Sequence, residues 1–236
     1  MEKLKFETRK HFFRRDELPS PLSEAAENVG RVMVDGYRMG TCFVASLDDR
    51  KFLVSALHCF LERQNKALTE GWAVFPSGDN FLVKPQWVLP PPSTAPDLDL
   101  LVSEVKRTGS IRPFRLSESH LPMIGQRVTL LGYPLSHLYS PEAENGAVAS
   151  FGVIDDLTPS VTSGDDIWMY VKVENGSSGS PVLDENNKVL GVLVHTVEPG
   201  RGGVNQSANI RRKSQKMNYV SVATSLNILS TIKDFG

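Results

Sequence analysis

The chain has 236 residues, of which 40% are hydrophobic and 22% charged, and its 26 basic and 27 acidic residues leave a formal net charge of −1. This balance excludes an intrinsically disordered chain, a collagen-like repeat and a strongly basic nucleic-acid-binding protein. The length suffices for one large or two small domains with a hydrophobic core. Two cysteines are too few for a disulfide framework or a four-thiolate zinc site, although they could form one bridge.

The amino terminus is rich in lysine and arginine, but neither an apolar run nor a small-residue cleavage site follows these charges. It therefore does not resemble a secretory signal peptide. The longest apolar runs, such as residues 189–194, are far shorter than the roughly 20 residues that span a bilayer. These features predict a cytoplasmic protein that does not enter a membrane.

Taken in chain order, the apolar residues recur mainly with a period of two, in short runs bounded by Gly, Pro, Asn, Asp and Ser. Such a pattern favours an all-β barrel or sandwich with few helices. The helix that we expect lies at residues 222–232, where Leu226, Leu229 and Ile232 approach helical spacing. We expect strands at residues 31–35, 40–47, 51–56, 72–75, 81–89, 98–105, 127–132, 147–154, 167–173, 181–183, 189–194 and 218–222.

Three segments contain residue types suited to nucleophilic catalysis. One expected strand is followed by His58, another is preceded by Asp97 after a proline-rich loop, and Ser178 lies in the run Asn-Gly-Ser-Ser-Gly-Ser-Pro at residues 175–181. A histidine can act as a general base, an aspartate can orient it, and a serine can be the nucleophile. Each segment alone could also be a packed histidine, a turn-capping aspartate or a flexible turn. Their occurrence together, each beside an expected strand, indicates a triad.

These segments resemble the three motifs of trypsin-like serine peptidases: Ser-Ala-Leu-His-Cys at residues 55–59, Asp-Leu-Asp-Leu-Leu at 97–101, and Gly-Ser-Ser-Gly-Ser-Pro-Val at 176–182. The serine segment is most similar to that of V8-type glutamyl endopeptidases and Htr-type proteases. The similarity extends over residues 29–232 and includes the stretch Gly-Gln-Arg-Val-Thr-Leu-Leu-Gly-Tyr-Pro at residues 125–134.

The resemblance implies an all-β, chymotrypsin-like fold of two antiparallel β-barrels with a C-terminal α-helix. We expect an N-terminal arm at residues 1–28, an N-terminal barrel at 29–118 with His58 and Asp97, and a C-terminal barrel at 119–236 with Ser178 and the helix. Phe6, Phe12 and Phe13 favour an arm that packs on the barrels over a disordered one.

The implied activity is that of a serine endopeptidase, a hydrolase that cleaves peptide bonds through an acyl-enzyme intermediate. His58 would accept the proton of Ser178, Asp97 would fix the histidine tautomer, and the backbone N–H groups of Gly176 and Ser178 would form the oxyanion hole. Asp99 is the competing carboxylate, because strand alternation points it the same way as Asp97; the motif favours Asp97. The expected partner is a protein or peptide substrate.

Departures from the digestive enzymes of animals carry a further prediction. Ser177 stands where members activated from a zymogen have an aspartate, and no Ile-Val-Gly-Gly cleavage site precedes the first barrel. The sequence therefore predicts a protease that is competent without terminal processing.

The sequence leaves two interpretations open for two pairs of residues. Lys172 and His195 could favour an acidic residue before the scissile bond, or they could be a solvated lysine and a packed histidine. Cys42 and Cys59 resemble the pair that bridges the histidine loop of animal enzymes, which would indicate an oxidising compartment, but in a cytoplasmic protein they would remain reduced core residues.

Other functions are less well supported by the sequence. No cofactor or metal is expected, since the five histidines show no ligand spacing with the cysteines. A nucleic-acid role is disfavoured, because the basic cluster Arg211, Arg212, Lys213 and Lys216 lacks interleaved aromatic residues. The alternatives to an endopeptidase are a catalytically dormant, protease-like protein-binding module and an esterase-type acyl hydrolase; the residue order argues against the α/β-hydrolase type.

Overall fold

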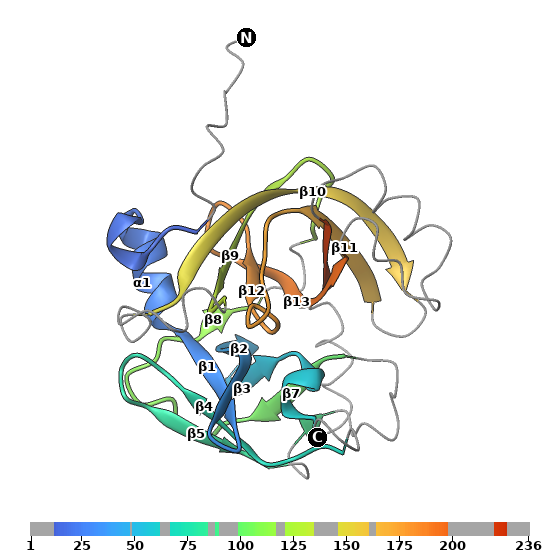
Figure 1. Ribbon diagram of the computed structural model, residues 1–236. Helices are drawn as coiled ribbons and strands as arrows, with labels where there is room; N and C mark the ends of the chain where they lie inside the picture. The colour runs from blue at the N-terminus through green and yellow to red at the C-terminus, as the bar shows by residue number, and fades with distance from the viewer. Residues whose placement is uncertain are drawn as a thin grey trace.

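The computed structural model describes residues 12–47, 49–61, 67–84, 88–89, 99–116, 121–134, 146–160, 164–197 and 220–225. Figure 1 shows two curled β-sheets, one formed by the N-terminal half of the chain and the other by the C-terminal half. The prediction of an all-β, chymotrypsin-like fold is thereby confirmed.

The N-terminal sheet is antiparallel except at one short strand. Its order is β5-β4-β1-β2-β3-β7-β6, and β8 pairs with β2 in parallel. Its core includes the fully buried side chains of Val32, Leu53, Phe60, Ala73 and Leu101. The strands are β1 (Val29–Val34), β2 (Tyr37–Leu47), β3 (Arg50–Ser55), β4 (Gly71–Val74), β5 (Asn80–Val83), β6 (Val88–Leu89), β7 (Leu101–Glu104) and β8 (Phe114–Arg115).

The C-terminal sheet closes into a barrel in the order β10-β11-β14-β13-β12-β9. Inward-facing residues such as Leu130, Ile154, Ile167 and Val182 form its core, as the alternation of a half-buried strand requires. The strands are β9 (Arg127–Gly132), β10 (Val148–Ser160), β11 (Gly164–Tyr170), β12 (Pro181–Leu183), β13 (Val189–Val197) and β14 (Val220–Ser225).

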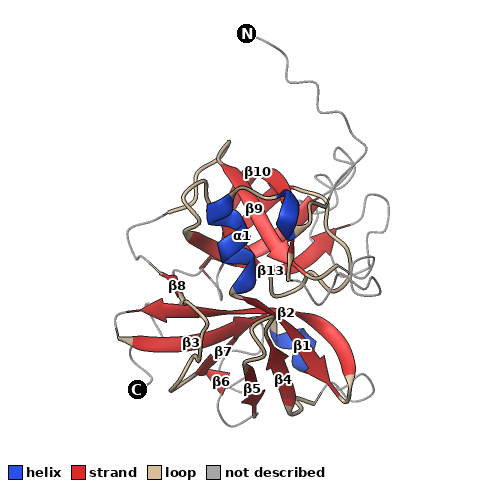
Figure 2. Cartoon of the chain, turned by 90° about the vertical axis from the view of Figure 1, so that its left-hand side faces the viewer, coloured by secondary structure: helices blue, strands red, loops and turns tan. Residues whose placement is uncertain are grey.

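A short helical segment, seen beside both sheets in Figure 2, precedes β1. It consists of the 3₁₀ turn η1 (Arg15–Glu17) and helix α1 (Ser20–Glu27). Leu22, Ala25 and Ala26 of α1 join a third core cluster that also contains residues from both sheets, such as Phe43 and Leu131. The helix therefore helps to fix the two sheets against each other.

The described part of the N-terminal arm packs against the C-terminal barrel. Phe13 and Ala149 exchange two backbone hydrogen bonds, each of 2.9 Å. The ring of Phe13 also meets that of Phe151 edge-on, with centroids 5.3 Å apart. Phe13 thus agrees with the expectation that the arm packs, whereas Phe6 lies outside the described residues.

Besides the short strand β8, which was not expected, three elements differ from the sequence prediction. Helix α1 was not expected, because its eight residues hold too few apolar positions to define a helical period. The single strand expected over residues 81–89 is instead two strands with different partners, since β5 pairs with β4 and β6 pairs with β7; residues 85–87 lie outside the described residues.

The third difference concerns the C-terminal helix. It was expected to begin at residue 222, but residues 222–225 belong to β14, which pairs with β11 and β13. Residues 226–232 of that expected helix lie outside the described residues.

The helices in the described part of the chain are all too short or too polar to span a lipid bilayer.

Candidate active site

His58 lies on the 3₁₀ helix η2 (Leu57–Phe60), which follows β3. The antiparallel pairing of β3 with β7 ends at Ser55 opposite Leu101. Beyond that pair the Leu57 N–H still donates to the backbone oxygen of Asp99, at 3.4 Å. The strand register therefore brings Asp99, the residue two before β7, to the start of η2.

Asp99 binds His58 through both carboxylate oxygens. The backbone N–H of His58 donates to Oδ1 at 2.9 Å, and the imidazole Nδ1 lies 2.6 Å from Oδ2. A neutral imidazole that donates from Nδ1 keeps Nε2 free to accept a proton. The pair therefore has the geometry of a general base held in one tautomer.

This contact differs from the sequence prediction, which assigned the carboxylate to Asp97. The carboxylate bonded to His58 is that of Asp99, and Asp97 lies outside the described residues. The physical reason is the strand register: Asp99 is opposite Leu57, next to the histidine, whereas position 97 is two residues earlier in the chain and farther from the start of β7. The sequence motif alone does not indicate which residues of β3 and β7 lie opposite each other.

The surroundings of His58 favour the protonated imidazole. Burial opposes the charge, but the hydrogen bond that His58 donates to Asp99, together with the hydrogen bond and charge of Cys59 and the charge of Asp99, outweighs it. These contacts raise the pKa of His58 from 6.5 to about 10. Asp99 thus contributes both a hydrogen bond and a charge to this shift of the His58 pKa.

Ser178 lies in a tight loop between β11 and β12. The Ser177 N–H donates to the Glu174 oxygen at 3.0 Å, which closes a turn whose third residue, Gly176, has a φ of 93°. A positive φ at that position is typical of a type II turn and favours glycine. The Gly179 N–H then donates to the Leu193 oxygen of β13 at 2.7 Å. The nucleophile candidate is therefore presented by a loop bonded at both ends.

Thr41 of β2 connects this loop to the N-terminal sheet. Its backbone N–H donates to the Ser178 oxygen at 2.8 Å, and its hydroxyl donates to the Gly176 oxygen at 2.8 Å. The Thr41 hydroxyl also accepts the Tyr133 N–H at 3.1 Å, and Ser55, just before η2, donates to the Thr41 oxygen at 2.7 Å. The sequence reasoning missed Thr41 and Ser55, although Ser55 begins its histidine motif at residues 55–59 and Thr41 lies in the strand expected over residues 40–47.

The loop also contains two backbone donors with no acceptor among the described residues. The N–H groups of Ser177, Gly179 and Ser180 are all bonded within the protein, whereas no hydrogen bond is found there for those of Gly176 and Ser178. Ser178 itself is only partly buried. Free donors beside a partly exposed serine could bind a developing oxyanion.

A comparison of the sequence with known families agrees with this geometry. The family described as trypsin-like peptidase domain matches residues 40–192, which is more than half of the chain. The chain belongs to the trypsin-like peptidase family. The predicted resemblance is thus confirmed, and membership supports its classification with the serine endopeptidases. None of the curated proteins matches this trypsin-like peptidase in sequence.

Solved structures of similar fold include several proteases. An HtrA-type protease AlgW with a decapeptide has a TM-score of 0.62 and 13% identity over 90% of this trypsin-like peptidase and 65% of the AlgW chain. The same protease with a tripeptide gives a TM-score of 0.57 and 15% identity over 88% and 59% of the two chains.

A serine endoprotease from Yersinia pestis has a TM-score of 0.59 and 14% identity over 92% of this trypsin-like peptidase and 67% of its own chain. At these identities the likeness shows the fold. The present chain spans about 59% of the length of the AlgW chain with the tripeptide.

The two cysteines of this trypsin-like peptidase are free and buried. Burial, followed by the charge of Cys59, raises the pKa of the Cys42 thiol well above its ordinary value. Cys59, next to His58, has its Sγ 3.7 Å from the Ser178 oxygen, to which it donates. The thiol therefore links the histidine segment to the serine loop.

The two residues considered for substrate specificity lie on either side of the serine loop. Lys172, just after β11, is partly buried. His195 lies in β13 opposite Val222, beside an irregularity in the strand register. The structure does not describe the His195 side chain, so their joint role stays a prediction. Among the described residues, no three His, Cys, Asp or Glu side chains are grouped as metal ligands would be.

Proposed function

We propose that this chain is a serine endopeptidase in which Ser178 is the nucleophile, His58 the general base and Asp99 the carboxylate that orients it. The observation that carries the proposal is the two-oxygen contact between Asp99 and His58, one residue from a thiol that reaches the Ser178 oxygen. Membership of the trypsin-like peptidase family supports the reaction class.

The proposed reaction has two halves. Ser178 Oγ attacks the carbonyl carbon of the scissile bond while its proton passes to His58 Nε2. The imidazolium then protonates the leaving amine, the C–N bond breaks, and an ester remains on Ser178. A water molecule gives a proton to His58 and attacks this ester, and the same proton returns to Ser178 as the carboxylic acid leaves.

The N–H groups of Gly176 and Ser178 are the proposed oxyanion-hole donors. Two features support this assignment: neither group donates to another described residue, and the positive φ of Gly176 sets the orientation of the peptide before it. Removing one such donor typically lowers the rate about 10²–10³-fold. Because the turn is already formed with Ser177 in place of an acidic residue, we propose that activity requires no terminal processing.

The proposed substrate is a protein or peptide. The AlgW structures of similar fold contain a tripeptide and a decapeptide, which supports this class of substrate here. For the residue before the scissile bond, the sequence prediction remains a choice between an acidic preference through Lys172 and His195 and none. A peptide-library cleavage profile distinguishes the two, because a preference for basic or bulky apolar residues would exclude the acidic pocket.

The decisive experiment is covalent labelling with a fluorophosphonate probe, followed by peptide mass mapping. We expect one adduct on Ser178 in the full chain, none in Ser178→Ala, and strongly reduced labelling in His58→Ala. Casein and a peptide library then test for peptide-bond cleavage. A protein that folds but takes up no label would be the dormant binding module, and one that hydrolyses only esters would be an acyl hydrolase; either outcome rejects the proposed function.

A further inference from the structure

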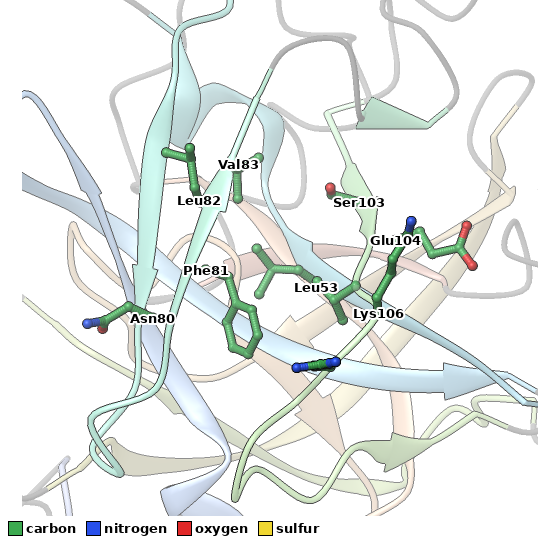
Figure 3. A pocket seen from close by; sticks show the side chains of 10 residues that line it. Leu53, Asn80, Phe81, Leu82, Val83, Ser103, Glu104 and Lys106 are labelled. Atoms are coloured by element: carbon green, nitrogen blue, oxygen red, sulfur yellow. The ribbon is translucent and has the colours of Figure 1, made fainter.

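An open groove lies at the end of the N-terminal sheet, between β5 and β7. Figure 3 shows side chains from both strands around it, with Leu53 of β3 at its floor. Its volume is about 770 Å³, within the range of roughly 300–1,000 Å³ that is common for ligand sites. None of its lining residues belongs to the candidate active site. The apolar part is formed by Leu53, Phe81, Leu82, Val83 and Val105.

Within the described residues, β6 does not bridge β5 and β7. Its two residues pair only with Val102 and Ser103 of β7. On the other side, no described strand pairs with the outer edge of β5, which ends the sheet. Among the described residues, the N-terminal sheet is therefore open at this seam, whereas the C-terminal barrel is closed.

The backbone of β5 presents hydrogen-bonding groups along this seam. The bond from the Phe75 N–H to the Asp79 oxygen, together with the register of Ala73 opposite Phe81, sets the phase of the β4–β5 ladder. In an antiparallel ladder, alternate residues bond to opposite sides. The N–H and C=O groups of Asn80 and Leu82 therefore point away from β4, toward the open edge.

One end of the groove is positively charged. Glu104 is held by two hydrogen bonds from Arg50, but Lys106 and Arg107 are exposed and form no ion pair with another described residue. These cations lie near the start of β5, because Ser110, a few residues beyond them, donates twice to the Asp79 carboxylate. The charge is thus at the Asn80 end.

We propose that this groove binds an extended, acidic peptide, which adds to β5 as an antiparallel strand and carries alternate apolar residues followed by carboxylates. Antiparallel addition places the carboxyl-terminal end of the peptide beside Lys106 and Arg107. The backbone edge favours a peptide over an apolar small molecule with an acidic head, because only a peptide satisfies the groups of Asn80 and Leu82. The site is a second recognition surface, separate from the catalytic one.

The test uses the full chain with Ser178→Ala, so that the probe stays intact whether or not the proposed function is correct. The probe is the fluorescein-labelled peptide Gly-Val-Ser-Val-Ser-Asp-Asp, and binding is followed by fluorescence anisotropy. We expect saturable binding that weakens about tenfold or more when Lys106 and Arg107 are both changed to Glu, since two attractions become two repulsions. Changing the exposed Arg127 and Lys188 to Glu is the matched control and should leave the affinity within about twofold.

A second measurement tests strand addition itself. Two further probes are N-methylated at alternate residues, one at the odd and one at the even positions, and both keep the side chains and the charge of the peptide. Only one of the two sets of N–H groups faces β5, so one probe should lose its binding and the other should keep it. In the unmethylated complex the amides of Asn80 and Leu82 should gain protection from hydrogen exchange. Equal binding of both methylation patterns, no effect of the Glu pair, or saturable binding of dodecanoate without binding of the peptide would each overturn the proposal.

Discussion

The carboxylate of Asp99 holds His58 at two points, with Oδ1 2.9 Å from the backbone nitrogen and Oδ2 2.6 Å from Nδ1. One group thus fixes both the start of η2 and the rotation of the imidazole. Because Ser55 and Leu101 are opposite each other in the ladder that leads to this contact, the position of the histidine depends on the register of β3 with β7.

Asp99→Asn should lower kcat about 10⁴-fold, because an amide NH₂ facing Nδ1 selects the tautomer that is protonated at Nε2. The measurement is steady-state hydrolysis of a peptide found by library screening. Asp97→Asn removes the same charge two residues away and should change kcat by less than about threefold. A larger loss in the Asp97 variant than in the Asp99 variant would restore the motif-based assignment.

The dependence of activity on pH follows from the same contact. A general base must be neutral, and the pKa of His58 is raised from 6.5 to about 10, through Asp99 and Cys59 against the opposing effect of burial. The acidic limb of kcat/KM, which reports the free enzyme, should therefore lie above the ordinary histidine range. Cys59→Ala should move this limb to lower pH. A wild-type limb at the ordinary histidine value, unmoved in the variant, would contradict both contributions.

The contribution of His58 to the free energy of unfolding should fall as the pH rises, whereas the activity should increase. Because the pKa of His58 is higher in the folded protein than its ordinary value of 6.5, the folded state binds this proton more tightly. The resulting stabilisation is complete below pH 6.5 and is lost as the pH rises through about 10. Urea unfolding of wild type and His58→Gln should give free energies that differ most near neutral or lower pH and converge in alkali. A difference that grows with pH would contradict the raised pKa.

The sequence predicted the parts of this site that depend on local order along the chain. His58 and Ser178 could be proposed from the sequence because each occurs in a short motif next to an alternating apolar strand, and neither proposal needs information from elsewhere. The choice between Asp97 and Asp99 was different, since both fit the motif and the same face of an expected strand. It is decided by the register of β3 with β7, which places Asp99 beside His58.

The same distinction explains the errors in the fold. Helix α1 is stabilised where Leu22 and Ala26 pack between two sheets, a tertiary effect that an eight-residue window does not contain. At the C-terminus, residue 222 was expected to end a strand and begin a helix, and pairing with β11 and β13 instead continues the strand to Ser225. Thr41 was missed for a related reason, because both partners of its hydroxyl are more than 90 residues away in the sequence.

Gly179 should be more sensitive to substitution than its backbone angle alone implies. Its φ is 88°, and that of Gly78 in the β4–β5 turn is 86°, so alanine should cost about 1–2 kcal/mol of strain at either position. A Cβ at Gly179 would also collide with the Thr41 oxygen and lie 2.6 Å from Ser55 Oγ, whereas one at Gly78 would meet nothing within 4 Å. We expect Gly179→Ala to lose roughly 1–3 kcal/mol more in urea unfolding and most of its activity. Equal losses in the two variants would show that the Ser178 loop can move away from Thr41.

Thr41 should position the catalytic loop through its hydroxyl. Thr41→Val keeps the shape of the side chain but leaves the Tyr133 N–H and the Gly176 oxygen without this partner, which costs about 1–3 kcal/mol when the groups are buried. Because Gly176 is a proposed oxyanion donor, kcat should fall about tenfold or more while KM changes little.

Thr41→Ser retains the hydroxyl and should restore most of the kcat lost in Thr41→Val. Thr158→Val, at an exposed position of β10, is the matched control for the loss of a hydroxyl and should behave as wild type. If Thr41→Val were destabilised in urea unfolding but kept its full kcat, Thr41 would support the fold without positioning the Ser178 loop.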